Sequence, residues 1–201
     1  MARAFRNRGF ETVTLDLHQE ADIQKDILEL QAKNLPGPFD VIWASPPCTT
    51  FSVCTISRHF VDGYPVSVEA FQGLQLVLKT IQLIHELKPR YFFIENPRGM
   101  LRSFPFMRRF IRRTATYCQY GDTRQKPTDI WTNNPHWHPR PICGPGDACH
   151  EASPRGSSGG TQGLANAYER GKIPMELCRE IAEACENSME KRAVIQQQIK
   201  Q

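Results

Sequence analysis

The stretch ASPPCTTFS at residues 44–52 places a cysteine directly after two prolines and an expected strand over Pro38–Ala44. Cys48 is therefore presented at the carboxyl end of that strand and not buried within it. A second expected strand, Tyr91–Ile94, runs into an acid in the sequence ENP at residues 95–97. Because ligands bind at the carboxyl ends of parallel strands, we expect the thiol and the carboxyl to share an active site.

Length and composition indicate a single domain over residues 1–201. With 201 residues and 40% hydrophobic composition, the chain can bury a sizeable core. No apolar run reaches the length of a membrane span and the amino terminus lacks a signal-peptide core, so we expect a cytoplasmic protein without a membrane partner. The seven cysteines lack the regular spacing of a secreted disulfide scaffold, so most should be free thiols. The net charge of +4 permits a polyanionic partner without demanding one.

Alternating strand and helix patterns predict an α/β fold with a parallel, doubly wound sheet. Apolar residues at helical spacing predict a long helix from Ser67 to Leu87, between the two strands named above. The other expected elements are a basic helix at the amino terminus, a buried strand over Phe10–Asp16, an arginine-rich helix over Phe104–Arg113, late strands over Thr116–Tyr120 and Asp129–Thr132, and a closing helix from Ile173.

Residues 133–163 form an irregular insertion that is rich in proline, glycine and serine and does not link two domains. Cysteine and histidine bind zinc in small loops that lack a core of their own. The insertion contains five such residues: His136, His138, Cys143, Cys149 and His150. Their spacing does not fit a standard zinc finger. We therefore expect no metal, and keep Cys143, Cys149 and His150 as the ligand candidates if zinc binds.

Several motifs, in their order and spacing, resemble those of DNA cytosine-5 methyltransferases, and especially the short phage and prophage members of that family. The resemblance covers most of the chain. The matching residues are Ser45-Pro46-Pro47-Cys48 with Phe51-Ser52 for the nucleophile motif, Glu95-Asn96-Pro97 for the acid motif, Tyr120-Gly121 followed by Arg124 and Lys126 for a variant of the arginine-bearing strand, and Ile173-Pro174 with Leu177-Cys178 for the closing helix.

The resemblance implies a Rossmann-like, S-adenosylmethionine-dependent methyltransferase fold and transfer of a methyl group to carbon 5 of cytosine in DNA. Because that carbon is a poor nucleophile, the Cys48 thiolate would first add to carbon 6 of the ring, while Glu95 meets nitrogen 3. The target base must be flipped out of the duplex to be reached. Arg124 and Lys126 would hold the flipped nucleotide, although Lys126 stands where the family usually has an arginine.

Two further sets of residues are implied by the same motifs. The residues expected to contact the substrate are Pro47, Asn96, Pro97 and Thr128, of which Thr128 stands at the family's second arginine. The residues expected to bind S-adenosylmethionine are Asp16, Leu17, Asp26, Ile27, Ser45 and Pro46, with Asp16 on the ribose hydroxyls and Asp26-Ile27 on the adenine.

These roles have plain structural alternatives. Cys48 could be a small apolar residue at a strand end, and Glu95 could cap a helix or pair with Arg98. Asp16 could end its strand in a turn, and Asp26 could be an ordinary exposed helix acid. Four arginines at helical spacing could face phosphates, although a solvated helix face is the simpler interpretation: Arg108, Arg109, Arg112 and Arg113.

The first central strand of the family's sheet has no counterpart in this sequence. Family members begin with a strand and a glycine-rich turn that cradles the methionine end of the cofactor, ahead of a helix that resembles residues 1–9. That strand would lie between those ending at Asp16 and Ser45, so its loss should leave backbone groups unpaired. A start codon assigned too late, a partner chain that supplies the strand, or a decayed copy would each explain the gap.

The expected function is cytosine-5 methylation of DNA in the cytoplasm of a bacterium or a phage-infected host. The alternatives are a non-catalytic DNA-binding protein and one half of a split enzyme. A folate-dependent hydroxymethyl transfer would also use a cysteine, but the order of the motifs favours methylation. Residues 133–163 would be a reduced target-recognition region, with Arg140 and Arg155 contacting bases or phosphates.

Overall fold

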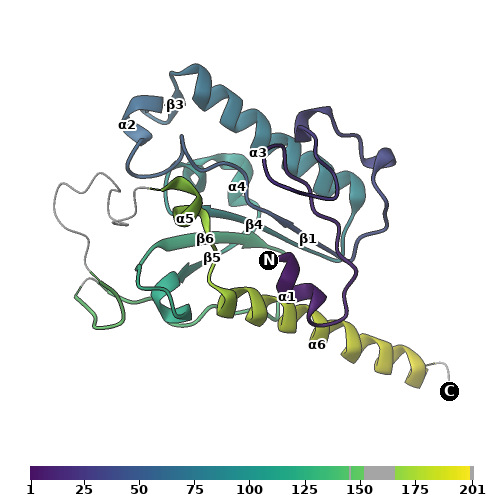
Figure 1. Cartoon of the computed structure of the whole chain (residues 1–201). Coiled ribbons are helices and arrows are strands. Elements are labelled where there is room, and N and C mark those ends of the chain that lie inside the picture. Colours follow the sequence, from purple (N-terminus) through teal and green to yellow (C-terminus); the bar gives the residue numbers. More distant parts are fainter. Residues whose placement is uncertain (145, 152–165, 200–201) are drawn as a thin grey trace.

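A four-stranded sheet forms the centre of the computed structural model, which describes residues 1–144, 146–151 and 166–199 (Figure 1). The strands lie in the order β1-β4-β6-β5. Their bounds are β1 Val41–Ala44, β4 Tyr91–Pro97, β6 Pro127–Thr132 and β5 Ile111–Thr116. β1 and β4 are parallel, as predicted, and β6 runs antiparallel to both of its neighbours. The predicted α/β fold is confirmed, and its sheet is mixed.

The length of each connection explains these directions. A parallel pair needs a crossover of a dozen or more residues, and residues 45–90 between β1 and β4 provide one that contains a 20-residue helix. Only residues 117–126 join β5 to β6, so β6 returns in the opposite direction.

The remaining elements are α1 Ala2–Arg6, η1 Ile27–Glu29, η2 Ala32–Asn34, α2 Ile56–His59, β2 Phe60–Val61, β3 Tyr64–Pro65, α3 Val68–Leu87, η3 Met100–Ser103, α4 Pro105–Arg108, η4 Tyr117–Tyr120, α5 Ala167–Gly171 and α6 Met175–Ile199.

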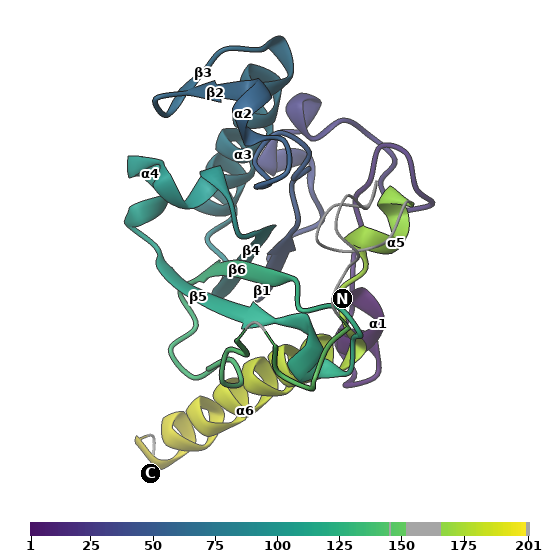
Figure 2. The same ribbon diagram turned by 90° about the vertical axis from the view of Figure 1, so that its left-hand side faces the viewer.

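Helices cover both faces of the sheet, with α3 and α4 on one side and α1 and α6 on the other (Figures 1 and 2). Side chains alternate along a strand, so Phe92 and Ile94 of β4 pack into the α3 side while Tyr91 and Phe93 pack into the α6 side. This double burial explains the uninterrupted apolar run YFFI. No described helix is long and apolar enough to cross a membrane.

The long helix predicted over residues 67–87 is confirmed as α3. The Ser67 side chain accepts a hydrogen bond from the Ala70 amide, which caps the helix start. Lys88 takes a left-handed conformation with φ 48° and ends the helix.

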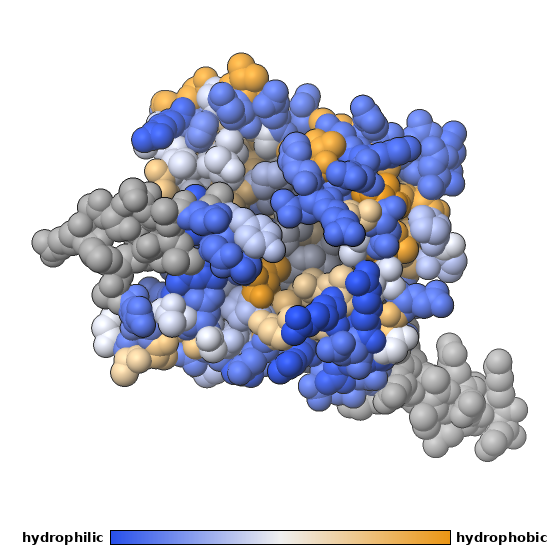
Figure 3. Space-filling view, in the orientation of Figure 1, coloured by the Kyte–Doolittle hydropathy of each residue, from blue (hydrophilic) through white to orange (hydrophobic). Residues whose placement is uncertain are grey.

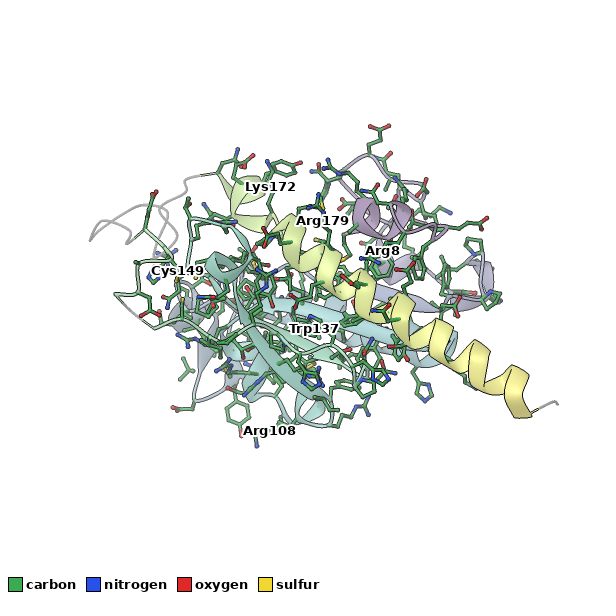
Figure 4. The ribbon with its side chains drawn as sticks, turned by 90° about the horizontal axis from the view of Figure 1, so that it is seen from below. Arg8, Arg108, Trp137, Cys149, Lys172 and Arg179 are labelled. Atoms are coloured by element: carbon green, nitrogen blue, oxygen red, sulfur yellow. The ribbon has the colours of Figure 1, made fainter. Side chains whose placement is uncertain are left out.

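On the opposite face of the sheet, Arg8 joins the segment after α1 to α6. Its guanidinium pairs with Glu183, at 3.1 Å, and with Glu186 (Figure 4).

The prediction of an arginine-rich helix over Phe104–Arg113 is wrong beyond its first turn. α4 ends at Arg108, and Arg112 and Arg113 belong to strand β5, where they oppose Trp131 and Ile130 of β6. The β-branched residues of IRRTAT favour a strand, and pairing with β6 satisfies the backbone groups that a helix would otherwise bond internally. The four arginines therefore do not form one helix face.

The prediction of a strand over Thr116–Tyr120 is also wrong. β5 ends at Thr116, and the next four residues form the 3₁₀ helix η4, which Gly121 ends at a left-handed φ of 81°. The Tyr117 amide donates to the carbonyl of Gln125 at 2.8 Å, so the chain folds back on itself here. As a result, the side chains of Tyr117 and Cys118 are buried.

The predicted buried strand over Phe10–Asp16 is reduced to one isolated parallel bridge, between Leu15 and Ile23. Val13 and Leu15 are 44% and 37% exposed. The physical reason is that no described strand lies beside this segment, and β1 pairs only with β4 among the described residues. Orange side chains accordingly gather at the upper right of Figure 3, over the segment between α1 and β1. One edge of β1 is therefore without a strand in the part of the chain that the structure describes.

Candidate active site

The loop that follows β1 presents Cys48. The carbonyl of Cys48 accepts hydrogen bonds from the amides of Phe51 and Ser52, both at 3.1 Å, which closes a tight turn around the thiol. The side chain is half-buried, and Pro47 beside it is exposed. A thiol in this position is held in place and can still be approached from solvent.

The end of β4 and the loop after it are fastened to the Cys48 loop at two points. The Asn96 amide group donates to the carbonyl of Pro46 at 2.9 Å. The Met100 amide donates to the carbonyl of Phe51 at 2.7 Å. At Gly99 a Cβ atom would lie 2.0 Å from that same carbonyl oxygen, so only glycine permits this approach. Two strand ends predicted to meet therefore do meet, through one side-chain and one backbone hydrogen bond.

Glu95 lies within β4 and is 6% exposed, which excludes the alternative of a helix-capping acid. Its carboxylate accepts a hydrogen bond from the Tyr117 hydroxyl at 3.2 Å. Burial raises the pKa of Glu95, while Lys126 and hydrogen bonds from Ser45 and Tyr117 oppose that rise. A carboxyl with a raised pKa keeps its proton to a higher pH than usual and can donate it to a bound base.

Lys126 supplies a positive charge to the same buried cluster. Its ammonium donates to the carbonyl of Arg170 at 2.7 Å and lies 4.5 Å from the centre of the Tyr117 ring. Burial lowers the pKa of Lys126, and the negative charges of Glu95 and Cys48 oppose that fall. Its backbone has φ 27°, a left-handed conformation that costs a non-glycine residue on the order of 1–3 kcal/mol and is concentrated at functional sites.

The charges of this cluster act on the Cys48 thiol in opposite directions. Burial is the largest cause of a raised pKa for Cys48, and the Glu95 carboxylate adds to it. Lys126 and Arg170 lower that pKa. The structure thus brings Cys48, Glu95 and Lys126 into one electrostatic unit, in which protonating Glu95 would favour the thiolate.

Arg124 is 8% exposed and is occupied by neighbours. It pairs with Asp122, with one bond of 2.8 Å from Nε, and donates to the carbonyls of Glu169 and Arg170, each at 3.2 Å. It also lines a hollow of about 250 Å³ between Asp122 and the start of α6. In this arrangement Arg124 fastens the α5 segment over the cluster.

The other residues expected to contact the substrate lie on the strands that frame the cluster. Thr128 of β6 is buried opposite Pro97 of β4, and its hydroxyl donates to the carbonyl of Lys126 at 3.2 Å. Asn96 is buried, and its side-chain oxygen has no hydrogen-bond partner in the described structure. An unpaired buried acceptor costs about 1–3 kcal/mol, so this oxygen is available to a bound group.

The residues expected to bind the cofactor divide into two groups. Ser45 and Pro46 lie at the Cys48 loop, where the Ser45 hydroxyl accepts from the Trp43 indole at 2.8 Å. Asp16 accepts from the amides of His18 and Gln19, at 2.8 and 2.9 Å, and so forms the turn named as its alternative. Asp26 caps η1 through the Leu28 amide, at 2.9 Å, with Ile27 half-buried and Leu17 exposed nearby.

Sequence reasoning missed two members of the cluster, Tyr117 and Arg170. Both come from segments without a recognised motif, a 3₁₀ turn and the short α5 helix. Arg140, a candidate for contacting bases or phosphates, pairs with Glu176 at 2.9 Å and Glu180 at 3.2 Å on α6. Arg155 lies outside the described residues.

Comparison with known proteins gives four similarities. Residues 13–105 match the family model for C-5 cytosine-specific DNA methylase. A protein of Frog virus 3 (isolate Goorha), named "Probable DNA (cytosine-5)-methyltransferase", is 32% identical over 162 residues, which are 77% of this chain and 74% of that protein.

Among solved structures, a protein assigned as a DNA modification methyltransferase from an E. coli prophage shares 20% identity, with a TM-score of 0.39 over 60% of this chain. A mutant of Spodoptera frugiperda DNMT2 shares 17% identity, with a TM-score of 0.44 over 70% of this chain. The chain spans 38% and 51% of the lengths of these two structures.

Proposed function

Because this chain belongs to the C-5 cytosine-specific DNA methylase family, we propose that it transfers a methyl group from S-adenosylmethionine to carbon 5 of cytosine in DNA. The observation that carries the proposal is that Cys48 and Glu95, toward the carboxyl ends of two parallel strands, share one electrostatic unit with the buried Lys126, which precedes β6. A nucleophile, a carboxyl with a raised pKa and a cation are what addition to a pyrimidine ring requires.

In the proposed reaction the Cys48 thiolate forms a bond from its sulfur to carbon 6 of the cytosine ring. Negative charge then builds on the ring, and Glu95 shares its proton with nitrogen 3 to stabilise it. Carbon 5 of the ring takes the methyl group. A base next removes the proton from carbon 5, the carbon–sulfur bond breaks, and Cys48 leaves as thiolate. Lys126 contributes by stabilising both anionic groups.

S-adenosylmethionine supplies the electrophilic methyl group when it is bound. The residues that would hold it fit a nucleoside: Asp16 offers a carboxylate for the ribose hydroxyls, and Ile27 an apolar surface for the adenine. The same segment contains a hollow of about 310 Å³, lined in part by Ile23 and Leu30. Ser45 and Pro46 follow β1, the position where ligands bind on open α/β sheets.

The first test is direct methyl transfer. Purified protein with labelled S-adenosylmethionine should label duplex DNA that contains cytosine, and should not label the same duplex with 5-methylcytosine at every cytosine. The label should be recovered as 5-methylcytosine after digestion. DNA binding without any transfer would contradict the proposal and identify the non-catalytic alternative.

We also propose that the free edge of β1 pairs with one more strand, supplied by a partner chain. Support comes from the half-burial of all four residues of Val41–Ala44 and from the exposure of apolar side chains in the segment between α1 and β1, namely Val13, Leu15 and Leu17. Unpaired backbone groups at a half-buried edge are costly, so a strand there would stabilise the sheet.

Hydrogen exchange tests this second proposal. In the chain alone, the β1 amides that point away from β4 should exchange fast, whereas those bonded to β4 should be protected. Residue-resolved NMR exchange distinguishes the two classes. Equal protection of every amide in Val41–Ala44 would show that the chain itself covers the edge, and no strand would then be needed.

A further inference from the structure

Four metal-binding side chains converge away from the Cys48 cluster. The sulfur atoms of Cys118, Cys143 and Cys149 and a ring nitrogen of His150 all lie within 4.8 Å of one another. Cys118 comes from η4 after β5, and the other three come from the loop that follows β6. Cys149 lies at an edge of the molecule, well apart from Arg8 and the middle of α6 (Figure 4).

Three separations between these atoms match the edges of a zinc tetrahedron. With Zn–S and Zn–N bonds of about 2.3 and 2.0–2.1 Å, ligand atoms lie about 3.8 Å apart for two sulfurs and about 3.6 Å for sulfur and nitrogen. The structure has 3.6 Å from Cys149 to Cys118, 3.8 Å from Cys143 to His150 and 3.6 Å from Cys149 to His150. Cys118 and Cys143 are closer, at 3.0 Å.

We propose that Cys118, Cys143, Cys149 and His150 together bind one structural zinc ion. Three thiolates and an imidazole are a closed ligand set, which leaves no open position for a substrate or a water. Two of the five candidates in the insertion, His136 and His138, are not in the cluster. Cys118 was not among the candidates because its segment was predicted to be a strand. Without Cys118, the remaining residues Cys143, Cys149 and His150 supply only three of the four ligands of a structural zinc site.

The surroundings of the cluster suit a structural metal. The Gln119 side chain donates to the Cys149 sulfur at 3.4 Å, which would offset the net negative charge of three thiolates around Zn²⁺. Backbone bonds fix the loop on both sides of the ligands: the Cys143 amide donates to the Thr116 hydroxyl at 3.3 Å, and the Glu151 amide donates to the carbonyl of Thr123 at 2.8 Å.

Zinc would replace a hydrophobic core for this loop. Residues 143–151, where described, form no helix or strand, and the side chains of Asp147 and Ala148 are exposed. The loop is also bonded to the segment that carries Lys126, because Gln125 donates to the carbonyl of Cys143 at 3.1 Å. A metal here would therefore stabilise the backbone next to the Cys48 cluster.

A disulfide between Cys118 and Cys143 is the competing explanation. It needs a sulfur separation of about 2.05 Å, well below the 3.0 Å found, and the two cysteines are free. It would also leave unexplained why Cys149 and His150 point to the same centre. Since four ligands converge here and a disulfide uses only two, the geometry favours the metal.

The test is the metal content of the full chain purified without chelator. We expect about one zinc per chain by elemental mass spectrometry, and, after exchange to Co²⁺, the intense visible bands of a tetrahedral thiolate site. Cys118→Ser and Cys149→Ser should each lower the zinc content at least about fivefold, whereas the exposed Cys54→Ser should leave it unchanged.

The cobalt spectrum is measured on the unaltered chain, so a variant that fails to fold does not leave the proposal undecided. Absence of stoichiometric metal, a Cys118–Cys143 disulfide in non-reducing mass spectrometry, or zinc retained by Cys118→Ser would each overturn it. Because metal content does not depend on methyl transfer, the zinc site and the proposed function fail or succeed separately.

Discussion

We expect the unaltered protein to form a covalent adduct with DNA containing 5-fluorocytosine, and Cys48→Ala to abolish that adduct. Fluorine at carbon 5 cannot leave as the proton does, so the bond from sulfur to carbon 6 persists after methylation and can be counted on a denaturing gel. Without the sulfur that bond cannot form. Methyl transfer to ordinary DNA should fall on the order of 10⁴-fold or more, the range typical of removing a nucleophile.

Cys54→Ala is the matched control. Cys54 is the other cysteine of the same loop region, is exposed, and makes no contact with Glu95 or Lys126 that the structure describes. Its alanine variant should trap DNA as the unaltered protein does. Because Cys48 is half-buried and small, its alanine variant should keep its folded circular dichroism spectrum. An adduct that survives Cys48→Ala would show that another residue is the nucleophile.

The two strand ends could be predicted from the sequence because their signals are local. Pro46 and Pro47 cannot continue a strand ladder, and the apolar run of Tyr91–Ile94 requires burial on both faces. Parallel pairing of β1 and β4 then places Ala44 beside Ile94, so the residues after each strand meet. This register brings Glu95 to the same edge of the sheet as the loop that carries Cys48.

The errors arise where tertiary pairing overrides local pattern. The arginines of the 104–113 segment have helical spacing. The β-branched Ile111 and Thr114 are nevertheless on a strand, because β6 supplies backbone partners along the whole of β5. Tyr117 and Cys118 follow that strand directly, and a backbone bond to Gln125 bends them inward. Such a contact depends on a distant residue, so the local sequence gives no signal of it.

Glu95→Gln is expected to lower methyl transfer on the order of 10²–10⁴-fold, the usual effect of losing a general acid. Glutamine is nearly the same size and can still accept the hydrogen bond from Tyr117, so only the proton and the charge are lost. Trapping of 5-fluorocytosine DNA should slow in parallel. Glu183→Gln, at an exposed carboxylate on α6, should leave both rates unchanged.

Glu95→Gln should also shift two pH profiles, that of Cys48 alkylation and that of folding stability. A purely structural role of Glu95 would not shift both. The Glu95 carboxylate raises the pKa of Cys48, so its removal should move alkylation of that thiol by iodoacetamide to lower pH. The pH dependence of folding stability should also differ between the variant and the unaltered protein. Burial raises the folded-state pKa of Glu95 above its ordinary 4.5, so the unaltered protein loses stability as pH rises from that value through the raised one.

Glutamine does not titrate, so the free energy of unfolding of the variant, relative to the unaltered protein, should increase with pH across that window. Chemical denaturation at a series of pH values measures this difference. A relative stability that stays flat with pH, or alkylation of Cys48 that moves to higher pH, would place Glu95 outside the electrostatic unit. Loss of methyl transfer in that variant would then come from misplaced backbone and not from a missing acid.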